Sequence, residues 1–345
     1  LTVLCAVIKA VDEYADLLRI SVASAGNDHR LGANEAPPAI ISMFLGDELQ
    51  QIVDALESGK MIKENQNKEF VIGVDALPNF PKDTTDRNRT SSFAFTGNKF
   101  EFRSLGSADT ISCTNYILNT IVAKEFKEFA DELEKSTDFA SDLNKLLVKT
   151  IKEHKRVIFN GNGYDDAWVE EAKRRGLPNY VSTVDAVEHY DDEKNIKLFE
   201  EFKVLSKTEV ESRREILLDN YSKIINIEAL TMLDMAKKQI IPAAFKFSKQ
   251  LADAMVSKKE IGVNYDAEKR LADKVSSLTN EVIAGVDAKL IDSKEKTDTL
   301  ENARFFREEV FSAMQSLRAV VDELETITPS EIWPFPTYTQ LLFTE

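Results

Sequence analysis

Long stretches with the apolar spacing of helices fill the second half of the chain, and they limit the folds it can adopt. From about residue 140 onward every long segment has this spacing. Further periodic segments run from 266 to 289 and from 299 to 324. The simplest architecture for this region is an antiparallel bundle of three long helices with shorter ones. The clearest periodicity begins near residue 208 and is carried by Leu217, Tyr221, Ile224, Leu230, Leu233 and Ile240.

Local signals predict how these helices begin and end. Thr208 and Glu211 match a capping box, which would start the longest helix. Pro242 lacks an N–H and crowds the preceding turn, so we expect it to kink or end that helix. The Trp- and Pro-rich segment 332–338 cannot continue a helix, and its apolar surface should pack on its own chain or on a neighbour.

The first part of the chain has a mixed pattern. Helical spacing starts at the first residues and should stop near Ala25–Asn27, with a short strand in 39–45 and an amphipathic helix over 47–58. Two strands, 92–95 and 99–103, flank a turn, and a helix follows over 110–135. We therefore predict an α+β fold with three parts. They are a mixed α/β part at 1–138, a helical domain at 139–328 and a packed tail at 329–345.

The chain begins within a helical pattern and has no initiator methionine. Leu4, Val7, Ile8 and Val11 already follow helical spacing, as they would in the middle of a domain. We therefore expect the chain to be a fragment of a longer protein.

Reactive side chains concentrate in two segments, 27–38 and 87–103. Strand alternation in the second places Lys99, Glu101 and Arg103 on one face, opposite two phenylalanines. Arginine forks bind carboxylate or phosphate, and glutamate oxygens hold magnesium or manganese. The set therefore indicates phosphoryl or carboxylate chemistry, whereas the alternative is a solvated strand face with incidental charges. The two segments supply Arg30, Arg87, Arg89, Arg103, Glu35 and Glu101.

Composition excludes several classes of protein. A formal net charge of -15 and a pI near 4.9 would repel a polyphosphate backbone, so we expect no nucleic-acid partner. No apolar run reaches the roughly 18 to 20 residues of a membrane helix, and no signal peptide is evident, so we expect a cytoplasmic protein without membrane contact. Cys5 and Cys113 are interpreted as small buried hydrophobes.

The segments 29–38 and 87–103 resemble those of the glutamine synthetase family, in particular its large type III branch. The general synthetase pattern covers about residues 1–126, and the rest resembles type III enzymes alone. The resemblance implies ATP-dependent amidation of glutamate by ammonia through γ-glutamyl phosphate, with Mg²⁺ or Mn²⁺ as metal. It also implies a ring-based homo-oligomer, a dodecamer in the full-length enzyme.

By this resemblance Arg30 and Arg103 bind the carboxylates of glutamate. Glu35 belongs to a loop that closes over the site and shapes the ammonium pocket. Arg89 contacts the transferred phosphoryl group, and Glu101 ligates a divalent metal. Lys99, with Arg89, is the candidate for nucleotide contact.

The chain departs from the family pattern at two positions. Ala94 and Lys99 stand where many synthetases have arginine, and lysine cannot reproduce a bidentate fork. The family's other metal-binding glutamates, its metal-binding histidine and its N-terminal domain have no counterpart after Leu1. We therefore expect the chain alone to be inactive. The competing hypothesis is a helical assembly or regulatory module at 140–345, in which the arginine segments have no catalytic role.

Overall fold

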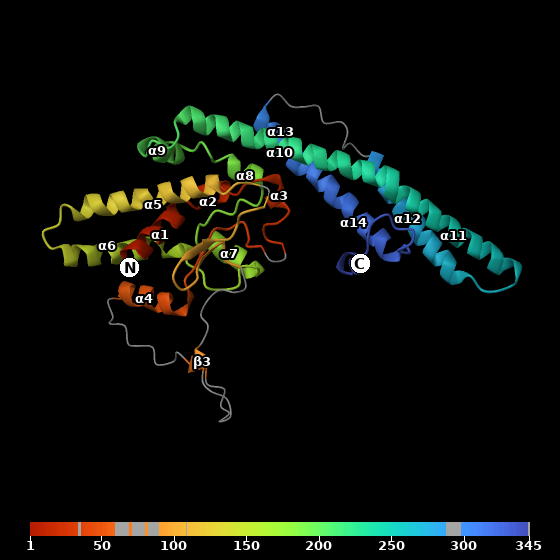
Figure 1. Ribbon diagram of the computed structural model, residues 1–345, viewed down its shortest axis with the longest axis horizontal. Helices are drawn as coiled ribbons and strands as arrows, with labels where there is room; N and C mark the ends of the chain where they lie inside the picture. Colours follow the sequence, from red (N-terminus) through yellow and green to blue (C-terminus); the bar gives the residue numbers. More distant parts are fainter. Residues whose placement is uncertain are drawn as a thin grey trace. The chain divides into compact units, whose positions relative to one another are not determined.

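The computed structural model describes residues 1–33, 36–58, 90–107, 109–287 and 298–343, and the backbone of 69–70 and 80–81. The chain divides into two compact units, residues 1–217 and 218–345 (Figure 1). The predicted domain bounds, 1–138, 139–328 and 329–345, stay a prediction. Among the described residues, no helix is long and apolar enough to cross a membrane.

The elements of the first unit mix helices with short strands. Their bounds are α1 Thr2–Glu13, α2 Ala15–Ile20, α3 Ala25–Asp28, β1 Met43–Phe44, α4 Gly46–Ser58, β2 Glu69–Phe70, β3 Phe80–Pro81, β4 Phe93–Phe95, β5 Phe100–Phe102, α5 Ser112–Leu133, α6 Phe139–His154, a 3₁₀ turn Lys155–Val157, α7 Asp166–Arg174, α8 Thr183–Val187 and α9 Glu193–Glu201.

The second unit is helical in the residues described. Helix α10 (Lys207–Met235) begins in the first unit and continues into the second. It is followed by a π turn Ala236–Ile240, α11 Ile241–Glu260, α12 Asp266–Asp287, α13 Thr299–Phe305, a π turn Phe306–Val310, α14 Phe311–Ile327 and α15 Tyr338–Leu342. The mixed, mainly helical α+β class is therefore confirmed.

Within the described residues of the first unit, a three-stranded sheet has the order β1–β4–β5. Strand β4 pairs parallel with β1 and antiparallel with β5, with Ala94 opposite Glu101. Ile158 extends the sheet by bridging to Met43, and the N–H of Phe159 donates to the Met43 carbonyl at 2.8 Å. The predicted hairpin is confirmed, because its alternation and its Gly97 turn, at φ +98°, are local signals.

Helix α1 forms the centre of the first unit's core, where it packs against α5 and α6 (Figure 1). The predicted single helix up to residue 25 is wrong, because the backbone leaves the helix at Tyr14, with φ −122° and ψ 31°. The ring of Tyr14 lies between the Nζ atoms of Lys124 and Lys194, 5.5 and 5.3 Å from its centroid. The apolar spacing continues through Tyr14, so it does not reveal that the helix breaks at this residue.

Glu125 of α5 is a fully buried carboxylate, at 0% side-chain exposure, between two lysines. Its oxygens lie 2.6 Å from Lys9 Nζ and 3.0 Å from Lys124 Nζ. We expect Glu125→Gln to lower the free energy of unfolding by about 2 kcal/mol, since it removes the buried charge that lies closest to both half-buried ammonium groups. Chemical denaturation measures this, with the exposed Glu193→Gln on α9 as control. Equal stability of the two variants would contradict it.

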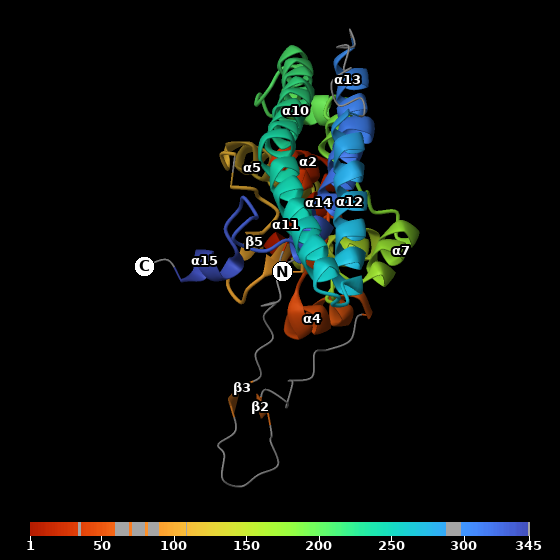
Figure 2. The ribbon, with the colours of Figure 1, turned by 90° about the vertical axis from the view of Figure 1, so that its right-hand side faces the viewer.

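Helices α11, α12 and α14 lie side by side in the second unit (Figure 2). Their shared apolar core includes Phe247, Val275 and Leu324, and Trp333 of the C-terminal segment packs into it. Part of that segment therefore folds back on its own chain, while the side chains of α15 are exposed. The predicted bundle as a whole stays a prediction, because 288–297 lie outside the described residues.

The start of α10 and the position of Pro242 differ from the sequence expectations. Ser206 caps α10 in place of Thr208, since its Oγ accepts the Glu209 N–H at 3.4 Å and its own N–H donates to Glu209 Oε2 at 2.8 Å. Both pairs, Ser206 with Glu209 and Thr208 with Glu211, match the capping pattern in the sequence. Pro242 lies at the start of α11, directly after the π turn, so the helical run continues through the proline. The predicted interruption is thus a π turn within a continuing helical run.

Candidate functional site

Arg30 lies in the turn after α3, beside the end of strand β5. Its NH1 donates to Asn27 Oδ1 and to the Ser104 carbonyl, both at 3.3 Å, and its NH2 donates to the Arg103 carbonyl at 3.4 Å. Ser24 caps α3 by accepting the Asn27 N–H at 3.3 Å, which fixes where the turn begins. Residues more than 70 positions apart in sequence therefore meet here.

The charged face of β5 carries a compact ion-pair cluster. Glu101 Oε1 lies 3.1 Å from Lys99 Nζ, and Glu101 Oε2 lies 3.2 Å from Arg103 NH2. Phe100 and Phe102 lie on the other face, with ring centroids 5.4 and 6.0 Å from that of Phe93. Hydrogen bonds from Lys99 and then from Arg103 lower the pKa of Glu101, so this carboxylate is ionised at neutral pH.

The structure brings together Arg30, Lys99, Glu101 and Arg103 from two separate segments of the chain. The guanidinium of Arg103 is mostly buried, at 14% side-chain exposure, whereas Glu101 is 38% exposed. Glu35 and Arg89, and the neighbouring Arg87, lie outside the described residues. The assigned roles of all these residues stay predictions.

Glu101 fits a divalent metal as a single ligand. It is an ionised oxygen donor of the kind that magnesium prefers, and it is partly exposed. Within the described ranges, no group of three or more His, Cys, Asp or Glu side chains could hold a metal.

Sequence reasoning missed Asn27, which joins Arg30 to β5. Asn27 is buried, and its Nδ2 donates to the Val22 carbonyl at 2.7 Å and to the Ser104 carbonyl at 2.8 Å. Its Oδ1 accepts from Arg30. Asn27 stands in the same motif as Arg30, but no local signal indicates a partner 77 residues away.

Gly163 approaches the residue that follows Arg89. A Cβ on Gly163 would stand 2.3 Å from the carbonyl oxygen of Thr90, closer than any non-bonded contact allows. We expect Gly163→Ala to destabilise the chain by about 1–3 kcal/mol, because backbone must shift. Thermal melting checks this against Gly26→Ala, whose Cβ would meet nothing within 4 Å. If Gly163→Ala has the same melting temperature as the wild type, the close approach of Gly163 to the Thr90 carbonyl is contradicted.

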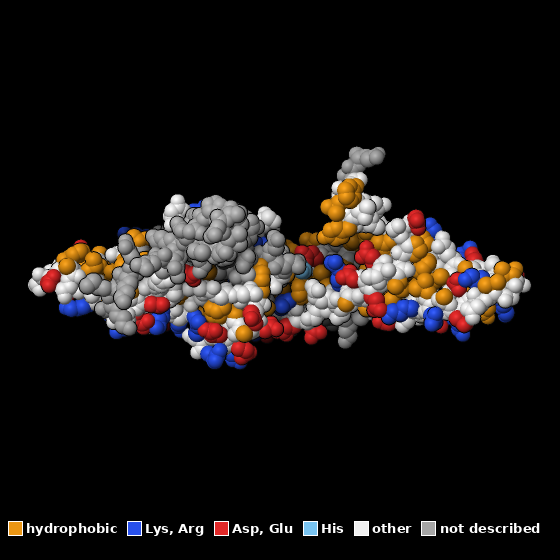
Figure 3. All heavy atoms as spheres, turned by 90° about the horizontal axis from the view of Figure 1, so that it is seen from below, with side chains coloured by type: hydrophobic (Ala, Val, Ile, Leu, Met, Phe, Trp, Pro, Cys, Tyr) orange, Lys and Arg blue, Asp and Glu red, His pale blue; other side chains and the backbone are white. Residues whose placement is uncertain are grey.

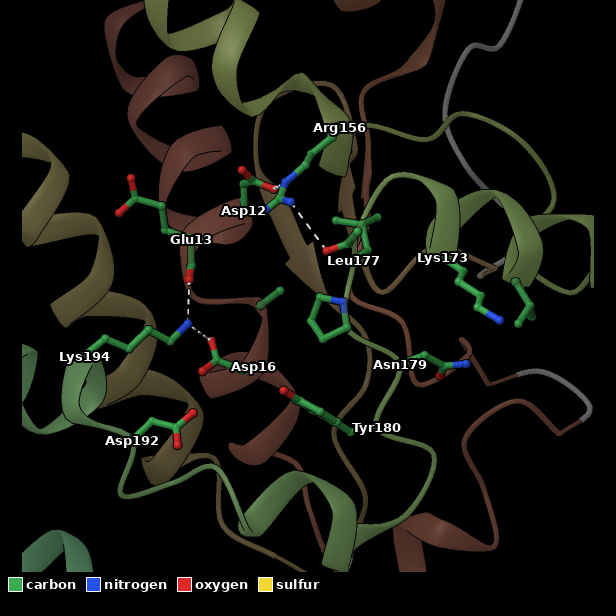
Figure 4. A pocket seen from close by; sticks show the side chains of 14 residues that line it. Asp12, Glu13, Asp16, Arg156, Lys173, Leu177, Asn179, Tyr180, Asp192 and Lys194 are labelled. Carbon is green, nitrogen blue, oxygen red and sulfur yellow. Dashed lines mark hydrogen bonds and ion pairs between the residues drawn. The ribbon is translucent and has the colours of Figure 1, made fainter.

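A cleft of about 550 Å³ in the first unit is lined by several charged side chains (Figure 4). Arg156 and Lys194 enter it from different elements, and each binds a buried carboxylate. Arg156 Nε lies 2.6 Å from Asp12 Oδ1, and Lys194 Nζ lies 2.8 Å from Asp16 Oδ1.

In this cleft each of the two cations has its own carboxylate, whereas at β5 Lys99 and Arg103 share the single carboxylate of Glu101. We therefore favour the β5 cluster as the substrate site for an anion.

Charge does not collect in a single basic stripe on the face shown in Figure 3, where acidic and basic side chains alternate. An arginine pair next to an ionised carboxylate suits an anionic substrate and, with further donors, a divalent cation. The arrangement favours binding of carboxylate or phosphoryl groups.

Comparisons with known proteins agree on one family. Residues 142–259 match the family model of the glutamine synthetase C-terminal domain. The chain is 41% identical to a type-3 glutamine synthetase of Dictyostelium discoideum, in a match that covers 99% of this chain and 48% of that protein. It is also 41% identical to a glutamine synthetase of Butyrivibrio fibrisolvens, over 99% of this chain and 50% of that protein.

A glutamine synthetase of Bacteroides fragilis is 34% identical, over 100% of this chain and 50% of that protein. The chain therefore spans about half the length of the curated relatives it matches.

Proposed function

This chain belongs to the glutamine synthetase family, and we propose that it supplies the glutamate and phosphoryl side of a glutamate–ammonia ligase active site. In the proposed reaction ATP phosphorylates the side-chain carboxylate of glutamate, and ammonia then displaces phosphate from γ-glutamyl phosphate. Glutamate, the nucleotide and the acyl phosphate are all anionic. Arginines and metal ions can therefore supply most of the electrostatic stabilisation.

The main support for this proposal is the contact between Arg30 and the end of β5. The guanidinium of Arg30 bonds to the backbone of Arg103, and the Arg103 side chain bonds to Glu101. These contacts hold two cations and one carboxylate at a single place, although they come from different segments. A solvated strand face with incidental charges would not require that convergence.

We assign the roles as follows. Arg30 and Arg103 bind the carboxylates of glutamate, and Glu101 is a ligand of Mg²⁺ or Mn²⁺. Lys99 contacts the nucleotide, and its present ion pair with Glu101 would give way when metal binds. The metal, when bound, neutralises charge on the transferred phosphoryl group.

For the residues outside the described ranges, we assign Arg89 to the phosphoryl group and nucleotide, and Glu35 to the loop that closes the site. Closure would exclude water, which otherwise hydrolyses the acyl phosphate. A ring-based homo-oligomer, a dodecamer in the full-length protein, completes the proposal.

Glu101→Gln tests the metal assignment in the full-length protein that we propose contains this chain. The amide keeps the size of the side chain but removes the charge that a hard cation needs. We expect the Mg²⁺ concentration for half-maximal glutamine formation to rise by about tenfold or more. The control is Glu323→Gln, on exposed surface of α14. An unchanged Mg²⁺ dependence would remove Glu101 from the metal site.

A further inference from the structure

A buried polar cluster joins α3 to the start of α8. The carboxylate of Asp28 accepts the Thr183 N–H at 2.9 Å and the Thr183 hydroxyl at 2.7 Å. Arg19 NH2 lies 3.5 Å from the same carboxylate, and the Asp28 side chain is 1% exposed. The other partners of Arg19 are the carbonyls of Tyr180 and Val181, at 2.8 and 3.4 Å.

This cluster lies two residues before Arg30. Helix α3 has four residues, far fewer than a helix needs to be stable by itself, so its orientation depends on what it contacts. Asn27 fixes it on one side, through the Ser104 carbonyl and Arg30. Asp28 fixes it on the other side, through Thr183.

The bonds between Asp28 and Thr183 demand a defined geometry. Charge-assisted hydrogen bonds are short and directional, and here both the backbone and the hydroxyl of one residue converge on a single carboxylate. Apolar packing could close the same space without a buried charge. Burial lowers the pKa of Arg19, while Asp28 opposes that change, so the ion pair is retained at a desolvation cost.

We propose that Asp28 and Thr183 are positioning residues for Arg30, so that the segment 180–183 sets the affinity of the site for glutamate. Thr183 lies within the region 142–259 that matches the glutamine synthetase C-terminal domain. The helical part of the chain thus acts on substrate binding through one hydroxyl and one backbone N–H. This inference rests on the proposed function, because it concerns the same substrate.

Thr183→Val in the full-length protein is the direct test. Valine keeps the shape and the backbone N–H of Thr183 but loses the hydroxyl donor to Asp28. We expect the KM for glutamate to rise about tenfold while the KM for ATP changes little, with a lower melting temperature because the buried carboxylate of Asp28 loses a charge-assisted bond. Thr183→Ser, which restores the hydroxyl, should return the KM for glutamate to near its wild-type value.

A purely structural role predicts another pattern. An unchanged KM for glutamate in Thr183→Val, or equal changes in both KM values together with a lower melting temperature, would overturn the positioning role. If Thr183→Val does not fold, Asp28→Asn, which keeps the size and one acceptor oxygen, carries the same expectations.

Arg30→Ala separates this inference from the proposed function. If that variant binds glutamate with the wild-type KM, the substrate assignment itself fails. If it raises the KM for glutamate and Thr183→Val does not, the positioning role alone fails.

Discussion

We expect the 345-residue chain, produced alone, to form no glutamine from glutamate, ammonia and ATP. The chain spans about half the length of its relatives, and we propose that the full-length protein supplies the other metal ligands from outside this chain. Without a metal to neutralise the phosphoryl group, arginines alone lack the charge that phosphoryl transfer requires. We therefore expect turnover at the background rate in a coupled assay of phosphate release.

A full-length protein containing the same chain is the positive control for that assay. Circular dichroism of the isolated chain, compared with its helical content here, shows whether it folds. ATP-dependent glutamine formation by the folded, isolated chain would contradict our proposal that this chain holds only one side of the active site.

Replacing Arg103 with alanine in the full-length protein has the second largest expected effect. Charge-assisted bonds to a desolvated guanidinium contribute about 1.5–3 kcal/mol each, and a glutamate carboxylate would form two of them. We expect kcat/KM for glutamate to fall by at least about 100-fold, since each 1.4 kcal/mol corresponds to a factor of ten. Steady-state kinetics with saturating ATP measures this loss.

Arg103→Lys distinguishes charge from geometry. Lysine keeps the charge but lacks the planar fork, so we expect it to recover only part of the lost activity. Arg318→Ala, on exposed surface of α14, is the matched control for loss of an arginine and should retain wild-type kinetics. Wild-type kinetics in Arg103→Ala would exclude Arg103 from the substrate site.

Features of the fold that depend on local pattern could be predicted from the sequence. The hairpin of β4 and β5 follows from alternation around Gly97, and α4, α5 and α12 follow from apolar spacing. The break at Tyr14 could not be predicted, because the apolar spacing continues through this residue, whose ring contacts the distant residues Lys124 and Lys194. The cap at Ser206 belongs to one of two overlapping capping patterns, and the local sequence does not choose between them.

The residue types of the candidate site could be predicted from the sequence, but the hydrogen bonds between distant residues could not. Four of its members, Arg30, Lys99, Glu101 and Arg103, were chosen from the sequence, and the structure places them together. Two sets of contacts could not be predicted from spacing or composition. Arg30 donates to backbone carbonyls just after β5, and Asp28 binds Thr183, which is 155 residues away.

Glutamate binding to the full-length protein, measured by isothermal titration calorimetry without turnover, tests the central claim most directly. The account predicts that Arg30→Ala and Arg103→Ala each weaken the affinity for glutamate by about tenfold or more, while Arg318→Ala leaves it unchanged. Wild-type affinity for glutamate in both site variants would contradict the claim that these arginines form the substrate side of a glutamine synthetase.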